Sequence, residues 1–392
     1  MRHGRAVSDS AMDALRKKTP LKDVAGYFLR LGLTAFGGPA AHIAMMEEET
    51  VRRRGWLSRE QFLDMLGASN LIPGPSSTEL AIHIGLARAG WPGLVLGGVC
   101  FILPAAVVTL LFAWAYVRYG GLAQAQAVLY GIKPVIIAVI AQALWGLTRT
   151  AVKSRFLAAL TLAAAVASFL GVNQLLVLVA AGIIAVVALE LTRPGGPRLA
   201  AVAVPAGVAI PSAGAALAGI PFGLMPLFLF FLKVGAVLFG SGYVLLAFLQ
   251  SSLVDRWHWL TQSQLLDAVA VGQFTPGPVF TTATFIGYLL GGLRGAVVAT
   301  IGIFLPAFFF VAVSGPLIPR LRRSPAAGAF LDGVNAASLA MMGVVVILLG
   351  RSALIDAPTC VLTAISTLSL IRWRVNSVWL VLGGGALGFV LK

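Results

Sequence analysis

Charge is what this sequence most clearly lacks. Only 11% of its 392 residues are Asp, Glu, Lys or Arg, against roughly 25% in a soluble domain. Its two cysteines, Cys100 and Cys360, share no motif. The sequence also contains no phosphate-binding loop, no residue spacing typical of a metal site, and no Ser, His and Asp motif that indicates a catalytic triad. These absences exclude a soluble domain and predict a protein that is not an enzyme and that has no cofactor and no metal.

Apolar residues are present in excess. They make up 59% of the chain, and the mean hydropathy is +0.93. Apolar runs of about 20 residues, long enough to cross a bilayer, recur from Tyr27 almost to Lys392. Because lipid offers no partner for an unpaired backbone group, such runs form helices or closed barrels, and continuous rather than alternating hydrophobicity favours helices. The sequence predicts an all-α, polytopic membrane protein embedded in the lipid bilayer.

The net charge of +15 does not indicate nucleic-acid binding. The basic residues stand in short groups between the apolar runs, which is the distribution that the positive-inside rule describes. Residues 1–20 are basic and polar with no adjacent apolar cleavage region, so we expect a cytoplasmic N-terminal tail rather than a signal peptide.

The chain contains an internal repeat. The stretch "FLRLGLTAFGGPAAHIA" from Phe28 matches "FLKVGAVLFGSGYVLLA" from Phe231 at a constant offset of 203 residues, which becomes 202 further along, where Gly131 matches Gly333. Register kept over a hundred residues is not chance. We expect two homologous transporter repeats at 21–195 and 222–392. The linker between them, 196–221, is apolar enough to cross the membrane once.

The basic loops of the two repeats lie at different places. In the first half they hold Arg149, Lys153 and Arg155, then Arg193 and Arg198; in the second half they hold Arg320, Arg322 and Arg323, then Arg372 and Arg374. The loops rich in basic residues in one half correspond to loops poor in charge in the other. Under the positive-inside rule this swap predicts an inverted-topology repeat, as in many secondary transporters.

Each half carries a Pro-Gly-Pro triplet inside apolar sequence, in "NLIPGPSST" at 70–78 and "QFTPGPVFT" at 273–281. Such a triplet interrupts a helix, and the next helix begins with unpaired N–H groups that suit an anion. A second break lies upstream in each half, "FGGP" at 36–39 and "FGSG" at 239–242, although small residues there also suit helix packing. The substrate-binding residues expected from the breaks are Gly37, Gly38, Pro39, Pro73, Gly74, Pro75, Ser76, Ser77, Thr78, Gly240, Ser241, Thr275, Pro276, Gly277 and Pro278. The alternative is a bend without any ligand contact.

Three cations within apolar sequence are further candidates for anion binding. Arg30 and Lys233 occupy the same position of the repeat, six residues before each glycine break. Either could instead extend its charge to the membrane interface. Lys133 also lies in an apolar stretch, and its repeat partner is the polar Asn335.

Glu79 and His42 are the candidates for proton coupling. Glu79 is the only acidic residue between Asp64 and Glu190, and a carboxylate at membrane depth is a functional candidate by default. Its spacing from Ser76 also fits a helix-capping box. His42 could carry a proton or could be a hydrogen-bonded packing residue.

The paired motifs resemble a known family. "FGGP", "GWLSREQFLD", "IPGPSSTELAIHIG" and "FILPA", repeated as "FGSG", "HWLTQSQLLD", "TPGPVFTTATFIGY" and "FLPAF", are similar to those of the chromate ion transporter family in its long, two-domain form. The resemblance implies a bacterial inner-membrane protein that exports chromate and confers chromate resistance, with sulfate as a similar tetrahedral oxyanion. The second half departs from the pattern where Glu79 becomes Thr282, so equal roles for the two breaks are not expected.

Two other functions remain open at this stage. One is a carrier or importer of sulfate or another oxyanion. The other is a channel or scaffold in which Pro-Gly-Pro is only a bend. A proton gradient is the expected energy source for transport, and a homodimer is one of the assemblies left open.

Overall fold

The computed structural model describes residues 19–36, 38–192, 221–239, 244–314, 324–373 and 375–392. Several expectations lie outside these residues: nearly all of the N-terminal tail and of the linker 196–221, and also Gly37, Gly240, Ser241, Arg193, Arg198, Arg320, Arg322, Arg323 and Arg374.

Every regular element in the described residues is helical. The first half contains α2 (Leu21–Thr34), α3 (Gly38–Glu47), the π-helix η1 (Glu48–Arg53), α4 (Arg59–Ser69), α5 (Ser76–Tyr119), α6 (Ala123–Ala151), α7 (Arg155–Phe169) and α8 (Gln174–Thr192). The second half contains α9 (Leu224–Val237), α10 (Leu245–Leu249), the π-helix η3 (Gln250–Arg256), α11 (Gln262–Phe274), the 3-10 helix η4 (Val279–Thr281), α12 (Thr282–Ser314), α14 (Pro325–Ala353), α15 (Ala357–Arg372) and α16 (Ser377–Leu391). The elements of the first half recur in the same order in the second, as the sequence repeat predicts.

The helix after each Pro-Gly-Pro triplet folds back on itself. In α5 the turn is at Gly90 (φ 68°), and in α12 it is at Gly292 (φ 58°), both in the region that favours glycine. Gly85 and Gly93 face each other so closely that a Cβ on Gly85 would overlap the Gly93 carbonyl oxygen. Each triplet therefore leads into a short helix, which turns back into a long one.

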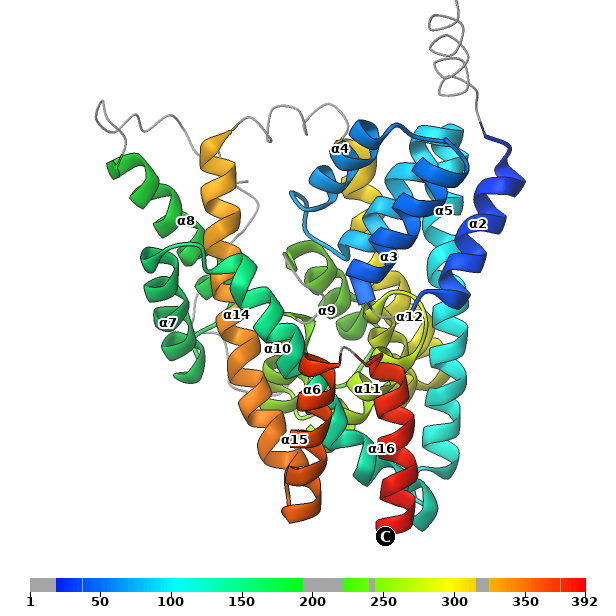
Figure 1. Ribbon diagram of the computed structural model, residues 1–392, viewed down its shortest axis with the longest axis vertical. Coiled ribbons are helices and arrows are strands. Elements are labelled where there is room, and N and C mark those ends of the chain that lie inside the picture. Colours follow the sequence, from blue (N-terminus) through cyan, green and yellow to red (C-terminus); the bar gives the residue numbers. More distant parts are fainter. Residues whose placement is uncertain (1–18, 37, 193–220, 240–243, 315–323, 374) are drawn as a thin grey trace, which may run out of the picture.

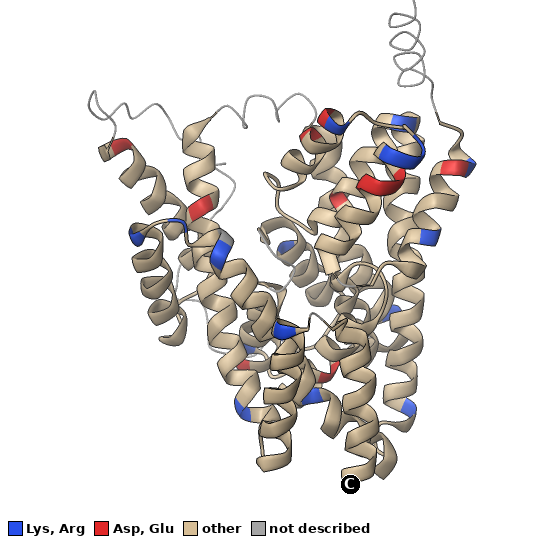
Figure 2. Cartoon of the chain, in the orientation of Figure 1, with Lys and Arg blue, Asp and Glu red and all other residues tan. Residues whose placement is uncertain are grey.

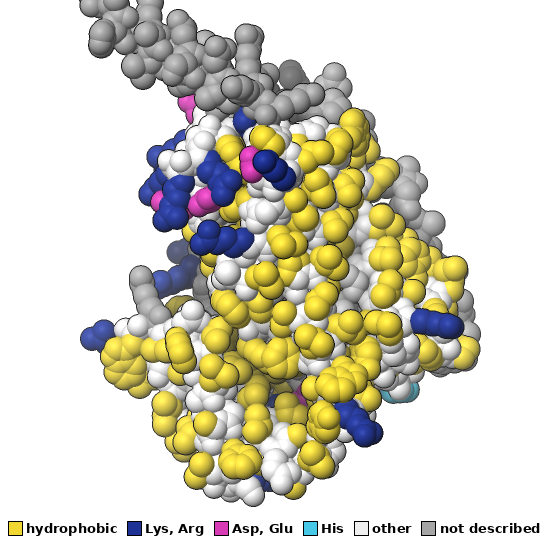
Figure 3. All heavy atoms as spheres, turned by 90° about the vertical axis from the view of Figure 1, so that its right-hand side faces the viewer, with side chains coloured by type: hydrophobic (Ala, Val, Ile, Leu, Met, Phe, Trp, Pro, Cys, Tyr) yellow, Lys and Arg dark blue, Asp and Glu magenta, His cyan; other side chains and the backbone are white. Residues whose placement is uncertain are grey.

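The apolar surface agrees with a membrane protein. Five of the described helical segments are long and apolar enough to cross a bilayer: Ser76–Tyr119, Ala123–Arg149, Gln174–Thr192, Val279–Ser314 and Pro325–Ala353. The helices α7, α9, α15 and α16 are apolar but shorter. Figure 3 shows hydrophobic side chains covering most of one face of the molecule, with a cluster of charged side chains near its upper edge.

The two halves are inverted and interlocked. In Figure 1, α6 runs up the view and its counterpart α14 runs down. The packing is reciprocal, because α6 contacts α15 and α16 of the second half, while α14 contacts α7 and α8 of the first. Within each half, α2 packs on α5 and α9 packs on α12. The inverted repeat predicted from the basic loops is confirmed by this arrangement.

The charged residues mark one end of the bundle. In Figure 2 the densest group lies at the upper end of the first-half helices, and the other charged residues are spread singly over the remaining helices. The Lys153 Nζ atom, just after α6, lies 2.8 Å from Oδ1 of Asp332 near the start of α14. The end of α6 and the start of α14 are therefore on the same face of the protein.

Candidate functional site

The two Pro-Gly-Pro loops are each fixed by a backbone hydrogen bond to the other half. The Gly74 N–H donates to the Leu238 carbonyl at 2.7 Å, and the Gly277 N–H donates to the Ala35 carbonyl at 2.8 Å. The two acceptors occupy the same repeat position, at the ends of α9 and α2. Both glycines have positive φ, 139° at Gly74 and 86° at Gly277. The triplets bring the two halves together at the centre of the bundle.

A cavity of about 680 Å³ lies against these loops. Of the predicted binding residues, Pro39, Pro75, Ser76, Ser77 and Pro278 line it. Its opposite wall is formed by α6 and α14, and Lys153 and Asp332 also contribute to its lining. The cavity thus joins residues that are about two hundred positions apart in the sequence. This association is what the repeated break motif predicts.

Other residues of the breaks do not line this cavity. Thr78 and Thr275 are buried, at 0% and 5% exposure, and neither hydroxyl oxygen has a hydrogen-bond partner among the described residues. Gly38, Pro73, Gly74, Pro276 and Gly277 also lie outside the lining. The glycines shape the loops rather than contact the cavity.

His42 connects three parts of the first half. Its Nε2 atom is 3.1 Å from the Ala35 carbonyl oxygen, and its Nδ1 atom is 3.3 Å from the Ser77 hydroxyl. Because the carbonyl only accepts, Nε2 carries a hydrogen, and a neutral ring then accepts the Ser77 proton at Nδ1. The Ala35 oxygen also accepts the Gly277 N–H. His42 therefore links a cavity-lining hydroxyl to the joint between the halves.

Glu79 is fully buried directly after the first triplet, with both carboxylate oxygens unpartnered among the described residues. A Cβ added to Gly74 would overlap its Oε1 atom. The capping-box interpretation of Ser76 and Glu79 is wrong, because α5 begins at Ser76 with Pro75 as N-cap and no side chain caps it. In the second half, Thr282 occupies this position and its hydroxyl donates to the Val279 carbonyl.

The three predicted cations are not in the cavity. Arg30 and Lys233 are exposed on α2 and α9. The Lys133 Nζ atom lies 3.2 Å from Asp267 Oδ1 and 2.7 Å from the Ser263 hydroxyl oxygen. Asp267 also accepts a hydrogen bond from the Tyr116 hydroxyl at 2.9 Å. Lys133 is thus engaged with Asp267 and Ser263 and does not line the cavity in this conformation.

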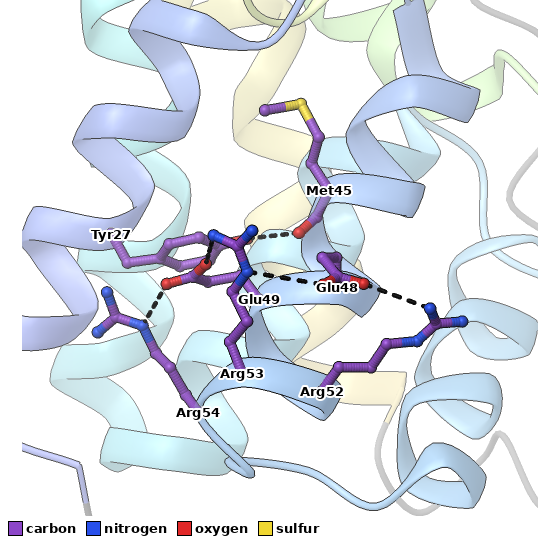
Figure 4. Close-up of polar contacts among 7 residues, drawn as sticks. All are labelled: Tyr27, Met45, Glu48, Glu49, Arg52, Arg53 and Arg54. Atoms are coloured by element: carbon purple, nitrogen blue, oxygen red, sulfur yellow. Dashed lines mark hydrogen bonds and ion pairs between the residues drawn. The ribbon is translucent and has the colours of Figure 1, made fainter.

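Charges also gather in "EEETVRRRG", where Figure 4 shows them pairing with one another. The Arg54 Nε atom is 2.7 Å from Glu49 Oε1, and Arg52 and Arg53 lie 3.4 Å and 3.6 Å from Glu48. Exposed pairs of this kind contribute about 0–1 kcal/mol each. Their effect here is to balance the basic residues, so η1 presents no uncompensated basic patch.

Sequence reasoning missed the wall opposite the loops. Gln142 of α6 and Asn335 and Ser338 of α14 line the cavity. The signal was the presence of polar residues in an otherwise apolar helix. Asn335 stands out only as the repeat partner of Lys133, and Ser338 is hidden among small residues in "NAASLAMM".

Comparison with known proteins gives a consistent result. The sequence profile of the family described as "Chromate transporter" matches residues 22–186 and again 225–389. The chain is 35% identical over 372 residues to the chromate transport protein of Cupriavidus metallidurans, covering 94% of this chain and 92% of the relative. It is 33% identical over 365 residues to the probable chromate transport protein of Synechococcus elongatus, with 91% of each chain covered. It is 30% identical to the chromate transport protein of Pseudomonas aeruginosa, covering 98% of this chain and 95% of that one. No solved structure matches the chain.

Proposed function

This chain belongs to the chromate transporter family, and we propose that it is a secondary transporter that exports chromate across the bacterial inner membrane. Proton coupling supplies the energy, and chromate resistance is the consequence for the cell. The observation that carries this proposal is the cavity in which Pro75, Ser76 and Ser77 of one Pro-Gly-Pro loop meet Pro278 of the other.

Chromate is a tetrahedral dianion, and the first loop has the chemistry to bind it. The helix α5 begins at Ser76, so its positive end lies where Pro75, Ser76 and Ser77 line the cavity. The Ser76 and Ser77 hydroxyls lie at the same place. Arg30 and Lys233, exposed at matched positions, would attract the anion from a longer distance. Export of a dianion from a cell that is negative inside is also favoured by the membrane potential, at about 2.3 kcal/mol per charge per 100 mV.

The inverted repeat supports an alternating-access mechanism. The α14 residues Asp332, Asn335, Ser338 and Met342 line the cavity, and the α6 residues at the same repeat positions are Tyr130, Lys133, Ile136 and Ile140. These α6 residues do not line this cavity: Ile136 and Ile140 are fully buried in the core, and Lys133 pairs with Asp267. The matching positions therefore line this cavity in one half and lie outside its lining in the other. An exchange of these two arrangements would move the opening to the opposite face.

Glu79 and His42 are the residues proposed to couple protons to this exchange. Glu79 adjoins Gly74, whose N–H reaches the other half. His42 contacts both Ser77 and the carbonyl that accepts the Gly277 N–H. Protonation of His42 would make Nδ1 a donor to the Ser77 hydroxyl, and this changes the hydrogen bonding of a group that lines the cavity. A proton change at either residue would therefore act on a loop that forms the cavity.

Everted membrane vesicles test the proposed function. We expect vesicles containing the protein to concentrate chromate when a proton gradient is imposed, because export from the cell becomes uptake in this orientation. A collapsed gradient and empty vesicles are the controls, and sulfate at increasing concentration measures selectivity. Sulfate accumulation without chromate accumulation would instead support the sulfate carrier, and concentration of neither anion under any gradient would support a channel or scaffold.

The role of the Lys133–Asp267 ion pair can be tested by replacing Asp267. We expect Asp267→Asn to expose the α6 face that carries Lys133 and Ile136, since removing one partner of a buried ion pair strongly destabilises the arrangement that buries the other. The positive-inside rule places the basic loop of Arg149, Lys153 and Arg155, and with it the cavity that Lys153 lines, at the inner face of the membrane. The probe is Ile136→Cys in a Cys100→Ser, Cys360→Ser background, labelled in intact cells with a membrane-impermeant maleimide that reaches only the outer face. Labelling should accelerate about tenfold or more, the population shift that about 1.4 kcal/mol produces.

Asp64→Asn is the matched control for this experiment, because Asp64 is the repeat partner of Asp267 and is exposed. It should leave the labelling rate of Ile136→Cys unchanged. Equal rates in the Asp267→Asn variant and its parent would remove the ion pair from the closing mechanism.

A further inference from the structure

The wall opposite the Pro-Gly-Pro loops has a polar face. Asp332, Asn335, Ser338 and Met342 of α14 line the cavity at intervals of three and four residues, so they share one face of the helix. On α6, Gln142 lines the cavity, as do Ala143, Gly146 and Leu147. These residues come from different elements than those of the loops, and none belongs to the repeated break motifs.

The Ser338 hydroxyl is the strongest indication of a ligand on this wall. Ser338 is 3% exposed, it lines the cavity, and its Oγ atom has no hydrogen-bond partner among the described residues. A buried hydroxyl without a partner costs about 1–3 kcal/mol, so such groups normally serve a ligand or a bound water. The adjacent turn of the same helix carries Asn335, whose amide can donate two hydrogen bonds.

The charge balance of the cavity makes these neutral donors important. Of the described residues that line it, Lys153 carries a positive charge and Asp332 carries a negative charge, and they pair with each other at 2.8 Å. An oxyanion in the cavity must therefore be bound mainly by hydrogen-bond donors and by the N-terminus of α5. A tetrahedral oxyanion directs its oxygens in four directions, and the first loop reaches it from one side only.

We propose that Ser338 and Asn335 of α14, with Gln142 of α6, form the second half of the oxyanion site, opposite Ser76 and Ser77. This inference rests on the proposed function and adds the residues that complete the coordination of the anion. The site is asymmetric between the repeats, because the partners of Ser338 and Asn335 are Ile136 and Lys133. The Asn335 amide and the Ser338 hydroxyl thus line the cavity from α14, and α6 has no amide or hydroxyl at the matching positions.

The test is chromate binding to the purified full-length protein, measured by calorimetry, together with the transport KM in vesicles. Ser338→Ala should weaken binding about tenfold or more, which is the loss expected for a hydrogen bond to a charged group. Ser352→Ala is the matched control, since Ser352 lies on the same helix and donates to the Leu349 carbonyl at 2.8 Å. That control should bind chromate like the unaltered protein.

Two substitutions at Asn335 separate a binding role from a folding defect. Asn335→Asp keeps the side-chain shape but adds a negative charge, so it should reduce chromate affinity more than Ser338→Ala does. Asn335→Lys introduces the residue that the first repeat has at this position, Lys133. The added positive charge should raise the affinity for chromate, a result that a misfolded protein cannot give. The inference is overturned if the unaltered protein binds chromate and the Ser338 and Asn335 variants bind it equally well. If the unaltered protein neither binds nor transports chromate, the proposed function itself fails.

Discussion

Glu79→Gln is expected to abolish proton-driven chromate accumulation while chromate binding is retained. The Glu79 carboxylate is fully buried and neither oxygen has a partner among the described residues. Holding an ionised carboxylate in such a place costs several kcal/mol, so release of its proton requires a conformation that gives it water or a cation. Glutamine keeps the shape of the side chain but cannot release a proton.

The measurement compares two kinds of chromate flux in the same vesicles. Chromate accumulation driven by an imposed pH gradient should fall at least about tenfold. A tenfold lower accumulation ratio corresponds to about 1.4 kcal/mol less free energy transferred from the proton gradient to chromate. Exchange of labelled for unlabelled chromate at equal pH should continue. Glu60→Gln is the control, because Glu60 is an exposed acidic residue in the first turn of α4. If Glu79→Gln retained normal pH-driven uptake, Glu79 would be a packing residue and the coupling proposal would pass to His42.

Gly277→Val is expected to eliminate transport and lower the stability of the protein. The backbone at Gly277 has φ 86°, which costs roughly 1–2 kcal/mol for a residue with a Cβ. That Cβ would lie 2.5 Å from the Ala105 Cβ and 3.2 Å from the Gly32 carbonyl oxygen. Overpacking of this kind costs typically 1–3 kcal/mol. The added side chain would also push the loop away from the Ala35 carbonyl.

Thermal unfolding in detergent and chromate uptake measure the two effects separately. Gly26→Ala is the control, since Gly26 lies in helix α2 with no neighbouring atom within 4 Å of an added Cβ. Alanine there should be neutral or stabilising by up to about 1 kcal/mol. Normal uptake by Gly277→Val would show that the hydrogen bond between the halves is not needed for transport.

Comparison of the two halves shows how far local sequence information reaches. The offset of 203 residues predicted that the two Pro-Gly-Pro loops correspond, and the basic loops predicted the inversion that Figure 1 confirms. The sequence also pointed to Ser76 and Ser77, which line the cavity. These features follow from helix-breaking residues and from charge distribution, both of which are local properties.

The positions of the charged residues could not be predicted from the sequence. Lys133 was expected to be a positive element for the anion, but it pairs with Asp267, 134 positions away, in this conformation. Arg30 and Lys233 are matched in sequence yet lie outside the cavity. The partner of a charged side chain depends on which helices pack together, and a single sequence does not contain that information.

The sequence by itself determined that the chain is a helical membrane protein built from two inverted repeats with paired breaks, because hydrophobicity, helix-breaking residues and basic loops are written along the chain. Only the tertiary structure decided which copy of each repeated position lines the cavity. Asn335 and Ser338 line the cavity, while their partners Lys133 and Ile136 are closed off by packing and by Asp267. The physical reason is that α6 and α14 each pack against the final helices of the opposite half. Which of the repeated positions line the cavity is therefore decided by long-range contacts and not by the sequence of either repeat alone.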